Sequence, residues 1–118
     1  MMHTLLLVED EEDLREMMRE ALEGKGYTVV TAADGAEALN AASRIESLCL
    51  VLLDLLMPGM NGWDFFDAFK ARPEFASVPV VVHSSAPSRA PAGVARVLQK
   101  PLKLERLLSV VQEHCAIT

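Results

Sequence analysis

The chain has 118 residues, 51% of them hydrophobic, and a formal net charge of −6. This length fits a single domain, residues 1–118, that is large enough to bury a core of its own. The negative charge argues against binding of a nucleic-acid backbone by this domain, and no apolar run reaches the length of a membrane span. The start lacks the basic and long apolar regions of a signal peptide, so we expect a cytoplasmic protein.

Strand and helix patterns alternate along the first half of the chain. Residues 3–8 predict a strand, and a run of acids at 9–13 follows at once. Apolar residues at helical spacing then predict a helix that ends at Gly24. A short β-branched strand at 27–31 comes next, and Asp34 caps a second helix.

The second half continues the alternation. Every residue from Leu48 to Leu53 is apolar, which predicts a central strand buried on both faces, and Asp54 follows directly. The remaining elements are a helix that stops before Pro73, strands at 78–83 and 96–99, and a final amphipathic helix with Leu104, Leu107, Leu108 and Val111 on its buried side. Between those last two strands, residues 84–95 contain two prolines and a glycine, which oppose a regular helix of several turns.

Five successive strand–helix units predict an α/β fold with a parallel sheet covered by helices on both faces. We expect a flavodoxin-like (βα)5 doubly wound sheet of strand order 2-1-3-4-5, with the fourth helix shortened or irregular. In that order the first and third strands are neighbours. Glu9, Asp10 and Asp54 therefore meet at the carboxyl edge of the sheet, where open α/β folds bind ligands.

These three acids predict a site for a hard cation. Three carboxylates repel one another, and full ionisation near neutral pH needs a cation or a lysine beside them. Mg²⁺ fits, because it prefers oxygen ligands and often uses only one or two carboxylates together with phosphate. For the acids at 11–13 we favour a plainer interpretation, a solvated helix start that suits the helix dipole.

Ser84 and Lys100 follow the fourth and fifth strands at the same edge. Alone, Ser84 is more often a loop or cap residue, and Lys100 is a surface lysine before a helix. Together with Asp10 and Asp54 they place one polar group at the end of each of four strands. That set favours phosphoryl transfer, which depends on positioning and charge neutralisation, with Asp54 as the nucleophile.

These residues make the chain resemble a response-regulator receiver domain of two-component signalling over essentially all of its length. The resemblance is carried by the Glu9-Asp10 pair, the motif Leu-Asp-Leu-Leu-Met-Pro-Gly-Met-Asn-Gly at 53–62, the strand that ends in Ser84, and Lys100-Pro101. It implies that Asp54 takes a phosphoryl group from a histidine kinase or a histidine phosphotransfer protein.

The resemblance also assigns the remaining roles. It implies Mg²⁺ bound by Glu9, Asp10, Asp54 and the backbone carbonyl of Leu56, with Ser84 and Lys100 contacting the phosphoryl group. It further implies a cis Lys100–Pro101 bond. Such a domain catalyses only its own phosphorylation and dephosphorylation and signals by binding a downstream protein, whose identity the sequence leaves open.

Three positions depart from the family pattern. Val97 stands where the family usually has Tyr or Phe, and a small side chain cannot switch between two pockets as a ring can. The segment from Ser84 to Lys100 is shorter than in typical members. Lys103 stands where a Ser, Thr or Asp normally caps the last helix. We therefore expect the phosphorylation response to centre on residues 84–94 and to be independent of aromatic rotation.

Three other functions fit the sequence less well. A Mg²⁺-dependent aspartyl-phosphate phosphatase usually resembles Asp-x-Asp at its nucleophile, and Leu56 occupies the second acid position here. A nucleotide-binding module lacks support, because no glycine-rich loop follows the first strand. A pseudo-receiver that only scaffolds partners is the third alternative. The chain ends soon after the last predicted helix, and it fits a stand-alone receiver or a fragment of a hybrid kinase or larger regulator equally well.

The two cysteines, Cys49 and Cys115, are far apart in the sequence and lie in apolar settings. In a cytoplasmic protein we expect both to be reduced core thiols rather than a disulfide or a metal pair.

Overall fold

A computed structural model of the chain describes residues 3–116, so the first and last two residues of the predicted domain lie outside it. The strands are β1 (Thr4–Val8), β2 (Thr28–Ala32), β3 (Leu48–Asp54), β4 (Val80–Ser84) and β5 (Arg96–Gln99). The helices are α1 (Glu12–Glu23), α2 (Gly35–Ala42), α3 (Gly62–Lys70) and α4 (Leu104–His114), with single 3₁₀ turns η1 (Pro73–Phe75) and η2 (Pro87–Arg89). No helix in this part of the chain has both the length and the apolar run that crossing a bilayer needs.

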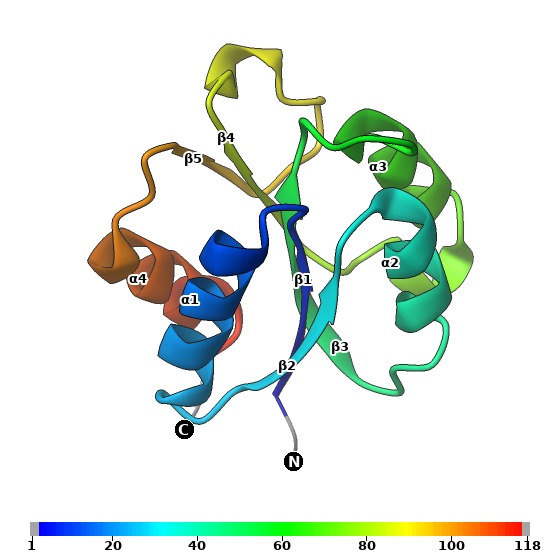
Figure 1. The fold of residues 1–118 in the computed structure, drawn as a ribbon. Helices are drawn as coiled ribbons and strands as arrows, with labels where there is room; N and C mark the ends of the chain where they lie inside the picture. The colour runs from blue at the N-terminus through cyan, green and yellow to red at the C-terminus, as the bar shows by residue number, and fades with distance from the viewer. Residues whose placement is uncertain (1–2, 117–118) are drawn as a thin grey trace.

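The five strands form one parallel sheet in the order β2-β1-β3-β4-β5, which confirms the predicted fold. α1 and α4 cover one face of the sheet, and α2 and α3 cover the other (Figure 1). Strand β4 begins at Val80 rather than at Val78 as predicted. Pro79 has no N–H for the ladder, although its carbonyl accepts from the backbone N–H of Val51 at 3.0 Å.

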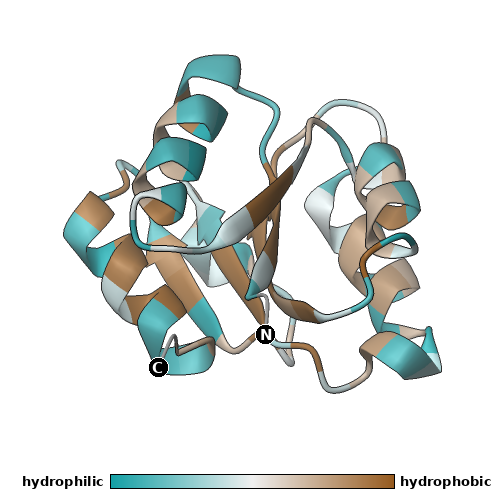
Figure 2. Cartoon of the chain, turned by 90° about the horizontal axis from the view of Figure 1, so that it is seen from below, coloured by the Kyte–Doolittle hydropathy of each residue, from teal (hydrophilic) through white to brown (hydrophobic). Residues whose placement is uncertain are grey.

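Alternation along the strands builds two cores (Figure 2). On the α1/α4 face the buried strand residues are Leu5, Leu7, Leu50, Leu52, Val81 and Leu98. On the α2/α3 face they are Leu6, Val8, Ala32, Val51, Leu53 and Val80, packed against three phenylalanines of α3. Because consecutive side chains point to opposite faces, the three central strands β1, β3 and β4 each supply both cores. The continuous apolar strands of the sequence follow from this double burial.

The connection between β4 and β5 contains only the single turn η2, which confirms that the fourth helix is shortened. It passes over the carboxyl end of the sheet as the yellow segment in Figure 1. Lys103 precedes α4 without any side-chain hydrogen bond to the helix, as its residue type predicts. The Lys100–Pro101 peptide bond is cis, as the resemblance implied.

The interpretation of Cys49 and Cys115 as free thiols was wrong, because the structure joins them in a disulfide. Their Cα atoms lie 5.9 Å apart although 66 positions separate them in the sequence. In a parallel α/β fold each helix runs back against the strands, so the end of α4 lies beside the beginning of β3. The Tyr27 hydroxyl also donates to the Cys115 carbonyl at 2.8 Å and fixes the same helix end.

Candidate phosphoacceptor site

The alternation that builds the α1/α4 core also assembles a polar cluster at the carboxyl edge of the sheet. Its members are Glu9, Asp54, His83 and Lys100, which lie two positions after the core residues Leu7, Leu52, Val81 and Leu98. Backbone hydrogen bonds continue the strand pairing to the ends of the strands. The Glu9 N–H donates to the Ala32 carbonyl at 3.0 Å, and the Lys100 N–H donates to the Ser84 carbonyl at 2.9 Å. The sheet itself therefore fixes the backbone from which each side chain of the cluster extends.

Glu9 is fully buried and accepts hydrogen bonds at both carboxylate oxygens. Its Oε1 lies 3.0 Å from Nε2 of His83 and 3.0 Å from Nζ of Lys100, and its Oε2 accepts from the backbone N–H of Glu11 at 3.0 Å. Burial alone would raise the pKa of Glu9, but these donors outweigh it and lower that pKa to about 2. Glu9 is thus an anion at neutral pH.

Asp54 ends β3 and is only 2% exposed. Its Oδ2 lies 3.5 Å from Nζ of Lys100, and its Oδ1 accepts from the backbone N–H of Leu56 at 3.3 Å. Burial and the charge of Glu9 raise the pKa of Asp54 to about 7, although Lys100 acts in the opposite direction. The candidate phosphoacceptor is therefore a carboxylate whose ionisation needs more positive charge than Lys100 alone supplies.

Lys100 connects the two acids. Partial burial disfavours its charge, but the hydrogen bond to Glu9 and the charges of Glu9 and Asp54 raise the pKa of its ammonium above the ordinary value. His83 differs, since complete burial lowers the pKa of its imidazole despite the contact with Glu9. We therefore treat His83 as a neutral donor to Glu9 rather than as the positive half of an ion pair.

The donor set around Asp54 fits a hard divalent cation. Carboxylate oxygens of Glu9, Asp10 and Asp54 lie within 4.8 Å of one another, and Asp10 is exposed. Because both oxygens of Glu9 already accept hydrogen bonds, direct coordination falls more naturally to Asp10 and Asp54. Burial first, and the negative charge of Glu9 second, raise the pKa of Asp54, and a bound cation would oppose both effects by favouring the ionised carboxylate.

The loop at 55–61 and the first residue of α3, Gly62, hold the backbone next to Asp54. Gly62 N–H donates to the Leu55 carbonyl at 3.0 Å. A Cβ at Gly62 would lie 2.6 Å from both the Asp54 carbonyl oxygen and Leu55 Cα, so only glycine permits this close approach. Leu56 lies beside the site and is 45% exposed, and its own N–H is the group that contacts Asp54.

Ser84 ends β4 on the side of the sheet opposite to His83. It is buried, and its Oγ accepts from the backbone N–H of Ala86 at 3.0 Å. Among residues 3–116 the Ser84 hydroxyl makes no hydrogen bond to Asp54 or to the Lys100 side chain, and the bond between Ser84 and Lys100 joins their backbones. The structure therefore brings Glu9, Asp54 and Lys100 into direct contact, places Asp10 beside them, and leaves Ser84 at the edge of the group.

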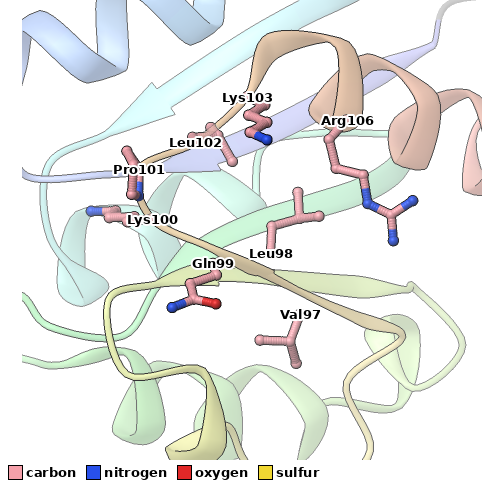
Figure 3. Close-up of a pocket in the computed structure, with 8 residues that line it drawn as sticks. All are labelled: Val97, Leu98, Gln99, Lys100, Pro101, Leu102, Lys103 and Arg106. Carbon is pink, nitrogen blue, oxygen red and sulfur yellow. The ribbon is translucent and has the colours of Figure 1, made fainter.

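A separate pocket of about 440 Å³ opens between β5 and the start of α4 (Figure 3). Val97, Lys103 and Arg106 line it, and Val97 is 37% exposed. Lys100 also borders this pocket, but Figure 3 shows its amino group pointing away from Arg106. The pocket therefore lies outside the acidic site.

Sequence reasoning missed two residues that hold the site together. His83 was assigned only to a strand, although its position two residues after Val81 put it on the same face as Asp54. Arg15 lies in the predicted first helix without an expected role, yet its Nη1 donates to the Glu9 carbonyl at 2.9 Å. The strand alternation could have identified His83, whereas nothing in the sequence pattern singles out Arg15 among the charges of α1.

Comparison with known proteins agrees with this geometry. The family described as the response regulator receiver domain matches residues 5–112. The transcriptional regulatory protein GlrR of Escherichia coli is 34% identical over 113 residues, which is 92% of this chain and 25% of GlrR. The DNA-binding response regulator MtrA of Mycobacterium leprae is 31% identical over 118 residues, 95% of this chain and 51% of MtrA. The chain thus spans about a quarter to a half of these relatives.

Solved structures show the same architecture. The chemotaxis response regulator CheY4 of Vibrio cholerae superposes with a TM-score of 0.85 at 30% identity, covering 96% of this chain and 98% of CheY4. A putative response regulator from Chloroflexus aurantiacus gives a TM-score of 0.89 at 29% identity, covering 99% of this chain and all of the other.

Proposed function

Because the chain belongs to the response regulator receiver domain family, we propose that Asp54 accepts a phosphoryl group from a histidine kinase or a histidine phosphotransfer protein. The observation that carries the proposal is the contact of Lys100 with both Glu9 and Asp54 at the strand ends. We place this activity in the cytoplasm, and we limit catalysis to the domain's own phosphorylation and dephosphorylation.

Asp54 is the nucleophile in this proposal. One of its carboxylate oxygens attacks the phosphorus of a phosphohistidine, the new O–P bond forms as the N–P bond breaks, and the imidazole leaves with the electron pair. The carboxylate must be ionised to attack, yet its pKa is about 7. Positive charge brought to the site increases the ionised fraction, which links the electrostatics of the site to its reactivity.

Asp10 and Asp54 would hold Mg²⁺ directly, together with the carbonyl of Leu56, and Glu9 would contact it through water. When bound, the ion neutralises charge on the carboxylates and on the incoming phosphoryl group. The protein's own residues contribute by positioning Asp54. The Leu56 N–H orients one oxygen of Asp54, and the Gly62 contact fixes the backbone beneath it.

After transfer, Lys100 is the cationic side chain that the structure places beside the phosphorylated residue. It lies 3.5 Å from Asp54 and needs only a small displacement to pair with them. The Ser84 hydroxyl keeps its hydrogen free to donate, because in this structure it acts only as an acceptor from Ala86. Movement of Ser84 and of the segment that follows it would carry the signal to a downstream protein.

Mass spectrometry after incubation with acetyl phosphate and Mg²⁺ tests the proposal. We expect one added phosphoryl group in the wild type and none in Asp54→Asn or when EDTA replaces Mg²⁺. Asp34→Asn is a matched control, because Asp34 is an acid that caps α2 away from the site, and it should be phosphorylated normally. Phosphorylation that persists in Asp54→Asn would exclude Asp54, and an unmodified wild type would instead favour a scaffold that binds partners without phosphotransfer.

A further inference from the structure

His83 has a defined chemical state in the cluster. It is fully buried, lies opposite Asp54 in the β3–β4 register, and places Nε2 3.0 Å from Glu9 Oε1. A carboxylate can only accept, so the ring proton of His83 must be on Nε2. Its Nδ1 has no hydrogen-bond partner among residues 3–116. The imidazole thus makes a single hydrogen bond from its ring, and that bond goes to Glu9.

Glu9 Oε1 accepts hydrogen bonds from two side chains that differ in how freely they can move. His83 is held by the sheet and fully enclosed, whereas the Lys100 side chain is long and partly exposed. Lys100 also lies within 3.5 Å of Asp54, so it has a second partner within reach. Any event that draws Lys100 toward Asp54 removes one hydrogen-bond donor from the buried Glu9 carboxylate. His83 is then the donor that remains on Glu9 Oε1.

We propose that His83 is a positioning residue that keeps Glu9 satisfied when Lys100 moves to the phosphoryl group on Asp54. This role rests on the proposed function and adds to it a residue that acts through Glu9 and Lys100 without touching the phosphoryl group itself. His83 takes no part in bond making. It lowers the cost of transferring Lys100 from one acid to the other.

The cost without His83 follows from the burial of Glu9. A buried charged group that loses its hydrogen-bond partner is destabilised far more than an exposed one. With His83 absent, Lys100 would be the only donor on Oε1, and the Glu9–Lys100 pair would resist separation. Phosphorylation would then have to overcome that pairing, so binding of a phosphoryl group would weaken.

Beryllofluoride, a phosphoryl mimic, tests this role by isothermal titration calorimetry at saturating Mg²⁺. We expect His83→Leu, which fills a similar volume without a donor, to bind it about tenfold more weakly, as loss of one hydrogen bond to a charged group implies. His83→Gln should bind within about threefold of the wild type, because its amide N–H can replace Nε2–H. Equal affinity for His83→Leu and the wild type would overturn the proposal.

The Lys100→Ala background separates positioning from a general structural effect. If His83 acts by releasing Lys100, His83→Leu should change beryllofluoride affinity by less than about threefold once Lys100 is absent. A full tenfold effect in that background would reduce His83 to a packing residue and overturn the proposal. If wild-type protein fails to bind beryllofluoride, the proposed function itself is wrong, and the role of His83 falls with it.

A measurement on the wild type keeps the proposal testable if His83→Leu does not fold. Nitrogen-15 spectra of the histidine rings report which ring nitrogen carries the proton and whether it is hydrogen-bonded. We expect the Nε2–H form of His83 to remain bonded after saturation with Mg²⁺ and beryllofluoride. Loss of that bond in the saturated protein would show that His83 does not hold Glu9 in the activated state.

Discussion

Trp63 holds the η2 turn against the start of α3 through Arg89. Its indole Nε1 donates to the Arg89 carbonyl at 2.8 Å, and the Arg89 guanidinium lies 5.0 Å from the centre of the indole ring. The same turn stands where a full helix was expected for the family, and it begins three residues after Ser84. One side chain therefore secures the segment that follows the candidate phosphoryl contact.

Replacing Trp63 with Phe should loosen this segment while α3 stays folded. Phe keeps an aromatic ring beside Arg89 but cannot donate to its carbonyl, so we expect amide hydrogen exchange in residues 85–95 to speed up about fivefold, for a loss near 1 kcal/mol. Trp63→Ala should speed it further, because the stacking contact is also lost. Amides of α2 serve as the internal control, and unchanged exchange in residues 85–95 of both variants would contradict the prediction.

The raised pKa of Asp54 predicts a stability that falls with pH in metal-free protein. Between its ordinary pKa of 3.8 and the raised pKa of about 7, Asp54 is protonated in the folded state but ionised in the unfolded chain. The folded state then binds the extra proton, so the free energy of unfolding decreases as pH rises through that window, by about 2–4 kcal/mol. Glu9 acts oppositely, since its lowered pKa adds stability that is lost only as pH falls from 4.5 through about 2.

Urea unfolding in EDTA from pH 5 to pH 8 measures this effect. Asp54→Asn cannot ionise at this position, and it should show a much flatter profile and higher stability than the wild type at pH 8. Asp64→Asn is the matched control, because Asp64 is an exposed acid in the first turn of α3, and its profile should follow that of the wild type. Parallel profiles for Asp54→Asn and the wild type would mean that the pKa of Asp54 is not raised.

The disulfide predicts a large loss of stability on reduction. It closes a loop between positions 66 residues apart, and constraint of the unfolded chain on that scale contributes about 4 kcal/mol. Cys115→Ser and Cys49→Ser should therefore lower the free energy of unfolding by similar amounts. Dithiothreitol should destabilise the wild type but leave both variants unchanged, and a wild type that is insensitive to the reductant would show that the thiols are free in solution.

The features that the sequence predicted correctly depend on patterns among residues that are close together in the chain. Continuous apolar strands and the break at residues 84–95 determine the sheet and the shortened connection, and the residue after each strand determines which groups reach the carboxyl edge. Glu9, Asp54 and Lys100 were expected together for that reason, and the structure places them within 3.5 Å contacts.

What it did not predict depends on pairs of residues distant in the chain. The Cys49–Cys115 bond forms only because α4 runs back across the sheet to the beginning of β3. The His83–Glu9 contact joins residues 74 positions apart. Predicting it requires knowing, for β1 and β4 together, which side chains lie on the same face of the sheet. Ser84 shares the sheet edge with the acids, but alternation along β4 places it on the other side from His83, so its contact with a phosphoryl group stays a prediction.

Leu56 predicts a long-lived phosphoryl group on Asp54, if the proposed function holds. Hydrolysis needs a water in line with the phosphorus, opposite the Asp54 oxygen, and phosphoryl transfer depends strongly on such positioning. Leu56 is 45% exposed beside the site, and its side chain cannot hydrogen-bond a water. Ala86, the corresponding position after Ser84, also lacks a polar side chain, so neither residue can orient the attacking water.

Decay of phosphorylated protein, freed of donor, measures that lifetime in the presence of Mg²⁺. We expect Leu56→Asn to lose the group about tenfold faster than the wild type, because a side-chain amide can hold the water in line. Leu56→Ala is the matched control: it opens the same approach to solvent without supplying a hydrogen bond. If solvent access rather than water orientation limits hydrolysis, Leu56→Ala will accelerate decay as much as Leu56→Asn, and the explanation by orientation will be wrong.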